Sequence, residues 1–426
     1  MDSSTVLGIP GFRFADLHDP ARLALLHERF CEDVQTADPA CWAGWDAYRR
    51  APDASRTPEL LSALLLTMAP YVGRFVARLF QIEPQAQAVR RATSGEDHLF
   101  RFKVDFVRRR AWPLTKAGTP VESTPDDDEL AERLIAAALT TDRELAIARA
   151  GCALLDREQA LERHTDRAAE AAQVWREIEA LKRWCAARLR HPAYRHWVVF
   201  RLPEPMNYWG LVDVNRSDPL LPEALQGPDE RLRRRDGFTL TDARMSPRAV
   251  LGEIHYCVLC HDRDKDSCSK GLLDKTGAAI LNPLAVPLHG CPLDQKISET
   301  HALRKAGDPI AALAMVILDN PMCPGTGHRI CNDCMTSCIY QKQTPVNIPQ
   351  IETGVLTDVL AMPWGVEIYG LLTRWNPLNV RRPYALPRNG KHVLVVGLGP
   401  AGYTLAHYLV NEGFGVVGID GLKIEP

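Results

Sequence analysis

Apolar residues recur every three or four positions through most of residues 1–245, which is typical of amphipathic helices. Asp19 and Pro20 are typical of a helix start, and three acids at 126–128 place negative charge where another helix would begin. The strongest strand candidate in this region is HWVVFRL. We expect helices over 21–34, 129–164 and 167–189, and a strand over 196–202.

The most apolar stretch of the chain is Leu60–Gly73, which lies between Glu59 and Arg74 and contains Pro70. Its length falls short of the roughly 20 residues that a membrane-spanning helix needs. Apolar residues continue at helical spacing as far as Phe80. The pattern therefore predicts one or two core helices and no membrane span.

A different pattern ends the chain. An apolar run over 391–396 is followed by the glycine-rich GLGPAG, a helical pattern over about 400–412 and a second apolar run over 415–419. This order predicts a strand, a helix and a second strand. The fold class is thus mainly α, with an incomplete Rossmann-like βαβ unit at the C-terminus.

Each glycine of this GxGxxG motif has an expected role. Gly397 would form the tight turn, Gly399 would let a pyrophosphate approach the backbone, and Gly402 would let the helix pack closely on the strand. Asp420, at the end of the second run, stands where an acid binds a ribose. The flanking strands make this motif more specific than a lone glycine-rich turn.

Length and charge narrow the class of protein. The 426 residues correspond to about three domains at roughly 150 residues each. The 51 basic and 53 acidic residues give a net charge of −2. Such a balance does not favour nucleic acid or an anionic membrane as a partner.

Eight of the twelve cysteines lie between residues 257 and 338 in short local groups. Such groups are typical of thiolate sites, because a CxxC turn brings two sulfurs to one metal centre. They predict two metal-sulfur centres. The eight are Cys257, Cys260, Cys268, Cys291, Cys323, Cys331, Cys334 and Cys338.

Disulfides are not favoured, since the N-terminus MDSSTVLGIPGF lacks the charged and apolar regions of a signal peptide. The spacing alone does not distinguish iron from zinc, because eight thiolates can also form two four-thiolate zinc sites. Both metals remain open at this point.

The segment 257–360 resembles the N-terminal iron-sulfur domain shared by the small subunit of bacterial glutamate synthase and by dihydropyrimidine dehydrogenase. The resemblance rests on the early CxxC, the CP at Cys291, KAGDPIAALAMVILDNP, the block GHRIC..C...C and TPVNIPQIE. It implies an α-helical domain with two [4Fe-4S] clusters. One cluster would bind Cys257, Cys260, Cys268 and Cys338, and the other Cys291, Cys331, Cys334 and Glu352.

The chain departs from the family's spacing at several points. A long insertion, residues 269–290, separates Cys268 from Cys291 and is expected to be a surface excursion, because lengthening a loop costs little once its ends are held. Two alternatives remain for the fourth ligand of the second centre. Cys323 could replace Glu352, and Glu352 could instead be a solvated acid at a helix start.

The same family continues into an FAD-binding strand with the motif GxGPAG, present here from Gly397 through Pro400 to Gly402. The resemblance implies a cytoplasmic NAD(P)H oxidoreductase that relays electrons between FAD and the clusters, and it assigns no catalytic residue. Because the chain stops at Pro426, we expect the remaining FAD and NAD(P)H domains in the same or a partner chain, with an electron-acceptor subunit as a further partner.

The alternative is a non-catalytic, metal-stabilised module that docks onto another subunit. In either case the expected organisation has four parts. They are a helical domain of unknown role (1–245), the two-cluster domain (246–360), a connecting arm (361–390) and the start of an FAD-binding domain (391–426).

Overall fold

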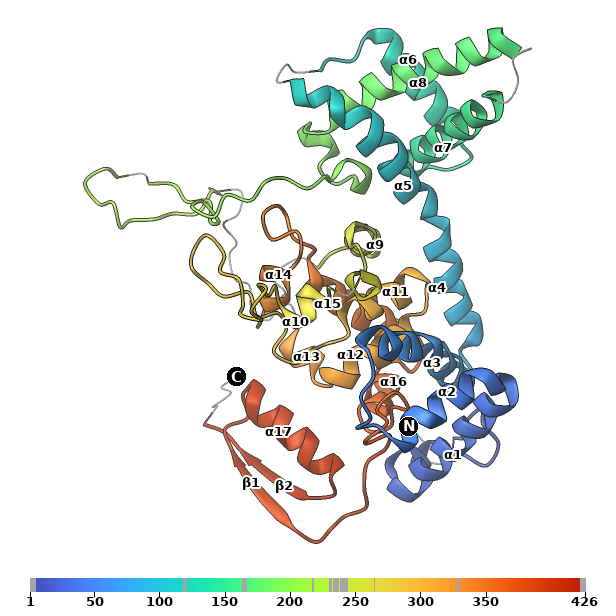
Figure 1. The fold of residues 1–426 in the computed structure, drawn as a ribbon, viewed down its shortest axis with the longest axis vertical. Helices are drawn as coiled ribbons and strands as arrows, with labels where there is room; N and C mark the ends of the chain where they lie inside the picture. Colours follow the sequence, from blue (N-terminus) through green and yellow to red (C-terminus); the bar gives the residue numbers. More distant parts are fainter. Residues whose placement is uncertain are drawn as a thin grey trace.

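The structure is a computed structural model, and it describes residues 5–117, 121–162, 167–216, 218–229, 232, 237, 244–263, 265–327 and 330–421. It is mainly helical, with one small sheet near the C-terminus (Figure 1). The coarse fold class predicted from the sequence is therefore confirmed.

The first helices begin at polar caps followed by proline. The Asp19 carboxylate accepts a hydrogen bond of 3.0 Å from the Ala21 N–H, so the predicted helix start is confirmed. Asp38 and Thr57 cap the next two helices in the same way. The N-terminal part of the chain contains η1 (Phe14–His18), α1 (Pro20–Ala37), α2 (Pro39–Arg50), α3 (Pro58–Leu79) and α4 (Glu83–Gly95).

α3 is one helix of 22 residues with Pro70 inside it, longer than its apolar stretch indicates. In the described part of the chain it alone is long and apolar enough to cross a membrane, and half of its most apolar window is buried. α15 (Ile348–Leu360) and α16 (Gly365–Leu372) pass that test only as one span bent by 120°. α3 packs against α12 (Pro309–Asp319), so its apolar face meets protein.

A second group of helices lies at the far end of the molecule, reached through α4 and α5 (Asp97–Arg101) (Figure 1). The region expected to be one helix over 129–164 is two, because the Asp142 carboxylate accepts from the Leu145 N–H and starts a new helix. The elements here are η2 (Phe102–Ala111), η3 (Trp112–Ala117), α6 (Pro125–Ala137), α7 (Arg143–Leu161) and α8 (Ala168–Arg188).

The prediction of a strand over 196–202 is wrong. Val198–Phe200 forms the 3₁₀ turn η6, preceded by η5 (Pro192–Tyr194). Trp197 and Phe200 stack on each other with ring centroids 5.6 Å apart, and both pack near Trp184 of α8. Aromatic packing against a helix has therefore outweighed the local preference for a strand.

The cysteine-rich segment is built around α12, in which all residues from Pro309 to Ile317 are buried. α12 packs against α3, α11 and α15, so the N-terminal helices and the cysteine-rich segment share one core. The other elements are α9 (Pro247–Tyr256), η8 (Cys260–Arg263), α10 (Ser267–Lys270), α11 (Ile297–Lys305), α13 (Cys323–Thr326) and α14 (Asp333–Thr336).

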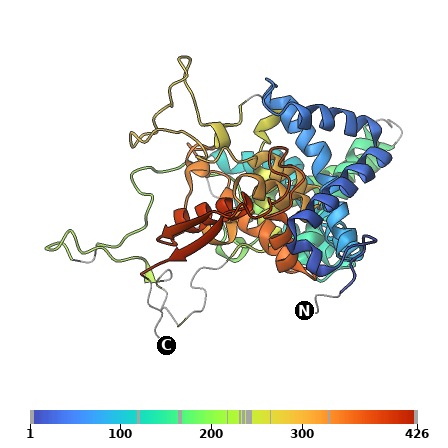
Figure 2. The same ribbon diagram turned by 90° about the horizontal axis from the view of Figure 1, so that it is seen from below.

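The C-terminal unit has the order expected from the sequence. β1 (His392–Val396) pairs in parallel with β2 (Gly415–Ile419), and α17 (Pro400–Asn411) crosses between them (Figure 2). His392 pairs with Gly415 and Val396 with Ile419. A parallel pair needs such a crossover helix, which is why this short stretch contains one.

Candidate metal centre

Four cysteines from three separate parts of the segment form the first group. Cys257 ends α9, Cys260 begins η8, Cys268 lies in α10 and Cys338 follows α14. Burial raises the pKa of the Cys257 thiol to about 12, and the charges of Cys260 and Cys338 act in the same direction. The pKa of Cys268 is also raised by burial and by the other three. These four thiols are electrostatic neighbours.

The CxxC turn of this group has a special backbone. Leu259 adopts a left-handed conformation with φ of 51°, and its N–H donates to the Cys257 sulfur at 3.4 Å. An N–H directed at a thiolate favours its charged form. The hydrogen bond from Leu259 therefore lowers the pKa of Cys257, although burial outweighs it.

The second group contains Cys291, Cys331, Cys334 and Glu352. Burial raises the pKa of Cys334, and Cys291, Glu352 and Cys331 raise it further. The pKa of Cys331 is raised first by burial and also by Cys291. The three sulfurs and the carboxylate are therefore neighbours, although Cys331 is exposed.

Glu352 lies in α15, where amides surround its carboxylate. Gln295 donates to it at 2.8 Å and Asn320 at 3.3 and 3.4 Å. Burial raises its pKa, and these two hydrogen bonds oppose that effect. The alternative of a solvated helix-start acid is wrong, because tertiary packing encloses this side chain.

Cys323, at the start of α13, is only 3% exposed. Burial raises its pKa, and the charge of Glu352 raises it further. Cys323 and Glu352 are therefore neighbours. Both alternatives for the fourth donor therefore stay open.

The 269–290 excursion is largely exposed and projects from the body, as expected (Figures 1 and 2). Two glycines with positive φ, Gly271 and Gly290, close its neck. A Cβ on Gly290 would lie 2.4 Å from the Gly271 nitrogen. The Gly290 N–H also donates to the Ser337 hydroxyl at 2.9 Å. The neck thus joins the residues next to Cys268, Cys291 and Cys338.

The nearby histidines have other contacts. His255 stacks on Phe100 with centroids 3.9 Å apart, and burial, with Lys305 and Lys103, lowers its pKa to about 3. His261 lies 2.5 Å from the Ser298 hydroxyl through Nδ1. His289 is exposed in the excursion. Phe100 and Ser298 therefore engage His255 and His261, whereas His289 faces solvent.

Some supporting residues could not be found from spacing. Tyr256 and Tyr340 stack 4.4 Å apart beside Cys257 and Cys338. Gln295 lies just before α11 and Asn320 lies at the end of α12, and both side chains donate hydrogen bonds to Glu352. These residues do not follow a recognisable spacing in the sequence, as the cysteines do, because only the packing of distant segments brings them to the site.

Among the residues that the structure describes, no three His, Cys, Asp or Glu side chains lie close enough together to hold a single metal ion.

The predicted nucleotide site occupies the turn between β1 and α17. Gly397 has a φ of 92°, and a Cβ on Gly402 would lie 1.8 Å from the Gly397 oxygen. A Cβ on Gly399 would meet no heavy atom of the described residues within 4 Å. The Leu398 N–H donates to the Asp420 carboxylate, so the acid lies at this turn. Pro400 is the first residue of α17.

α17 also contacts the cysteine-rich segment. A Cβ on Gly325 would lie 2.6 Å from the Tyr403 hydroxyl, so Tyr403 of the first turn packs against α13. Cys323 is two residues from Gly325. α17 is therefore packed directly against α13, the helix that begins at Cys323.

Comparison with known proteins gives a family for the N-terminal helices only. Residues 7–81 match the model of the RP005 N-terminal alpha-helical domain. The chain is 26% identical over 298 residues to the uncharacterized protein RP005 of Rickettsia prowazekii (strain Madrid E), which covers 67% of this chain and 94% of RP005.

The chain is also 57% identical over 105 residues to the uncharacterized protein RP006 of the same organism. That similarity covers 25% of this chain and only 15% of RP006. No solved structure matches the chain. The chain is thus similar to these two uncharacterized proteins, and it spans only a small part of RP006.

Proposed function

We propose that this chain is part of an FAD-dependent, iron-sulfur NAD(P)H oxidoreductase, similar to the glutamate synthase small subunit, that relays electrons between flavin and two [4Fe-4S] clusters. The proposal is supported by one observation: cysteines from distant parts of the chain lie close enough to raise one another's pKa within each proposed set. Iron-sulfur clusters supply one-electron transfer at potentials that the surrounding protein sets.

The first cluster would be held by Cys257, Cys260, Cys268 and Cys338, and the second by Cys291, Cys331, Cys334 and Glu352. A [4Fe-4S] core lies between its ligands. Its thiolates therefore stay farther apart than in a zinc site, where Zn–S bonds of about 2.3 Å bring four sulfurs together. The proposal does not require a compact single-ion group.

The residues around these donors would control charge and water. The Leu259 N–H directed at Cys257 stabilises negative charge on that sulfur. Cys260, Cys268 and Cys338 are each 5% exposed, which keeps water from most of the first group. Low exposure and N–H···S bonds are features by which a protein tunes a cluster.

The flavin would bind at Gly397, Gly399, Pro400, Gly402 and Asp420. Its pyrophosphate would meet the N-terminus of α17, where backbone N–H groups and the helix dipole favour an anion. The contact of Tyr403 with Gly325 supports a flavin position close to the second cysteine group.

The sheet exposes apolar side chains on both strands, including Leu394, Val396, Val417 and Ile419. A two-stranded parallel sheet with such exposure calls for further strands and helices. We propose that these come from the remaining FAD and NAD(P)H domains, in the same or a partner chain, and that an electron-acceptor subunit binds as well. The reduced thiols fit a cytoplasmic location, with no membrane or nucleic acid as a partner.

The test is the content of iron, acid-labile sulfide and zinc in anaerobically purified chain, with an absorbance spectrum of the same sample. About eight iron and eight sulfide per chain would agree with two [4Fe-4S] clusters. About two zinc and no sulfide would contradict the proposal and favour the metal-stabilised docking module.

A further inference from the structure

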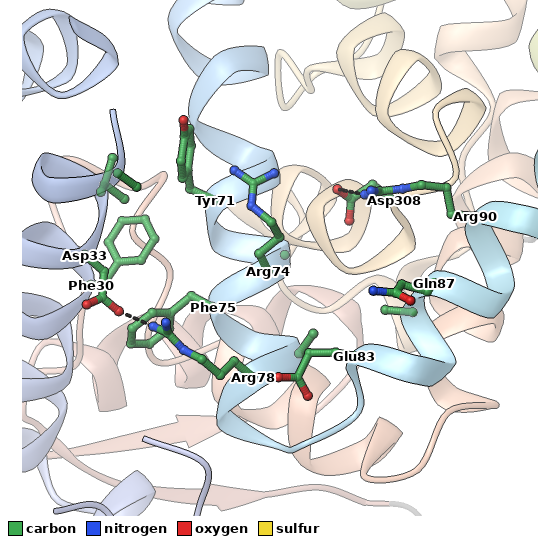
Figure 3. A pocket seen from close by; sticks show the side chains of 15 residues that line it. Phe30, Asp33, Tyr71, Arg74, Phe75, Arg78, Glu83, Gln87, Arg90 and Asp308 are labelled. Carbon is green, nitrogen blue, oxygen red and sulfur yellow. Dashed lines mark hydrogen bonds and ion pairs between the residues drawn. The ribbon is translucent and has the colours of Figure 1, made fainter. Parts of the chain in front are cut away.

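A cavity of about 370 Å³ lies between α1, α3 and α4 (Figure 3). Asp308, just before α12, closes one side of it. Asn320, at the other end of α12, contacts Glu352, so the cavity is separated from the second cysteine group by the length of this helix. Its volume is within the range of small-molecule sites.

One wall of the cavity is apolar and rigid. Phe30, Val34 and Phe75 line it and are 1%, 2% and 4% exposed. Phe30 meets Phe75 edge to face at 5.4 Å, and Trp375 stacks behind Phe75 at 5.6 Å. These side chains are packed into the core and form the rigid floor beneath the cavity.

Three arginines line the polar side, and two of them are already neutralised. Arg78 pairs with Asp33, and Arg90 pairs with Asp308 at 3.3 Å. Their charges are therefore balanced by carboxylates from other elements.

Arg74 differs from the other two arginines. Its guanidinium lies over the Tyr71 ring at 4.3 Å, and within the described ranges no carboxylate forms an ion pair with it. The Tyr71 hydroxyl is itself held by Asp38 at 2.8 Å. Figure 3 shows Arg74 between Tyr71 and the Arg90–Asp308 pair. The stacking thus positions a guanidinium whose hydrogen-bond donors remain available for an anion.

We propose that this cavity binds a small organic anion, whose carboxylate or phosphate group contacts Arg74 and whose apolar body lies beside Ala37, over the floor formed by Phe30, Val34 and Phe75. Glu83, from the first turn of α4, is the acid that would disfavour a second negative group in the same ligand. The site is independent of the clusters and of flavin.

The test uses the full chain and three probes of similar shape: benzoate, phenyl phosphate and the neutral benzamide. Isothermal titration should detect saturable binding of at least one anion, about tenfold or more tighter than that of benzamide, because a charged hydrogen-bonded contact contributes that much. The preferred anion identifies the head group as a carboxylate or a phosphate.

Two variants and a control complete the test. Arg74→Gln should reduce anion binding to the level of benzamide, and Ala37→Trp should reduce binding of all probes by filling the cavity. Arg91→Gln is the matched control, since Arg91 lies on α4 next to Arg90 and does not line the cavity. Circular dichroism and metal content should match the unsubstituted chain.

The proposal is overturned if neither anion binds, if benzamide binds as tightly as both anions, or if folded Arg74→Gln keeps the affinity of the unsubstituted chain. These outcomes leave the metal content unaffected, so failure here is separate from failure of the proposed function.

Discussion

The N–H of Cys291 donates a hydrogen bond of 2.9 Å to the carbonyl of Cys268. These two cysteines belong to different donor groups and flank the 269–290 excursion. Cys334 and Cys338 are also from different groups, and Cys338 lies two residues after the end of α14, the helix that contains Cys334. The two groups are therefore built on one scaffold, and a distortion at their junction should affect both.

The neck of the excursion offers a direct test. In Gly290→Ala, the added Cβ would lie 2.4 Å from the Gly271 nitrogen and 2.6 Å from the Ser269 oxygen, at a φ of 82°. We expect it to lower the free energy of unfolding by roughly 2–5 kcal/mol, from the positive φ and the crowding together. Chemical denaturation and iron content should both report the change.

Gly277→Ala is the control for that variant. Gly277 has a φ of 85°, but its Cβ would meet no heavy atom of the described residues within 4 Å. Only the backbone cost of about 1–2 kcal/mol should remain. Equal effects of the two substitutions would mean that the close contact at the neck does not hold the groups together.

Single cysteine variants should divide the iron by group. Cys260→Ala should remove about four iron by emptying the first group, and Cys334→Ala should remove about four from the second. Cys260→Ala should also destabilise residues 250–360 together, because metal binding is coupled to folding. Iron analysis and hydrogen exchange measure the two effects.

Cys41→Ser is the control, since Cys41 is partly exposed on α2 and far from both groups in sequence. Unchanged iron and stability in Cys260→Ala would show that Cys260 is not a ligand.

The fourth donor of the second group can be identified by comparing Glu352→Ala with Cys323→Ser. The Glu352 carboxylate accepts hydrogen bonds from the Gln295 and Asn320 side chains, whereas Cys323 contacts Asn320 through its backbone N–H, at 3.2 Å. We expect Glu352→Ala to lose about four iron and Cys323→Ser to retain all of it. The reverse result would assign the ligand to Cys323.

Substitutions at two glycines of the glycine-rich turn should have different effects, one on flavin binding and the other on folding. Gly399→Val should leave α17 folded but block flavin in a longer polypeptide that completes the sheet, since its Cβ points into open space. Gly402→Ala should instead disrupt the unit, because its Cβ would lie 1.8 Å from the Gly397 oxygen.

Flavin absorbance of the purified protein and circular dichroism separate the two effects. Gly95→Val, at an open position at the end of α4, is the matched control. Flavin retained in Gly399→Val would contradict the pyrophosphate role.

We expect the free energy of unfolding to depend on pH through Asp127 of α6, which pairs with Arg183 of α8. Burial alone would raise the pKa of Asp127, but hydrogen bonds from Arg183 at 3.0 and 2.6 Å, with Thr124, lower it below 3.8. The pKa of Asp127 is lower in the folded state than in the unfolded state. The stabilisation of the folded state by its ionised carboxylate is therefore complete above pH 3.8 and is lost as the pH falls through the folded-state pKa.

Asp127→Asn should lower the free energy of unfolding at neutral pH by about 1–3 kcal/mol and flatten its dependence on acid pH. Urea unfolding at several pH values provides the measurement. Asp126→Asn, exposed in the same first turn, should change little. A pH dependence unaltered by Asp127→Asn would refute the role of this pair.

The sequence by itself determined the local structure. The Asp19 cap acts on the next turn, and the strand, helix and strand near the C-terminus follow from apolar periodicity and three glycines. Such interactions join residues close in the chain, so a linear pattern contains them. The ligand sets themselves came from family resemblance, and metal binding remains a prediction.

Only the tertiary structure decided what depends on distant packing. It placed Glu352 among the amides of Gln295 and Asn320, replaced the strand expected at Trp197 by an aromatic cluster, and packed α3 against α12. It also left Arg74 above Tyr71 in a cavity. Burial and charge pairing arise where separate elements pack together, and a local sequence pattern does not predict which elements will do so.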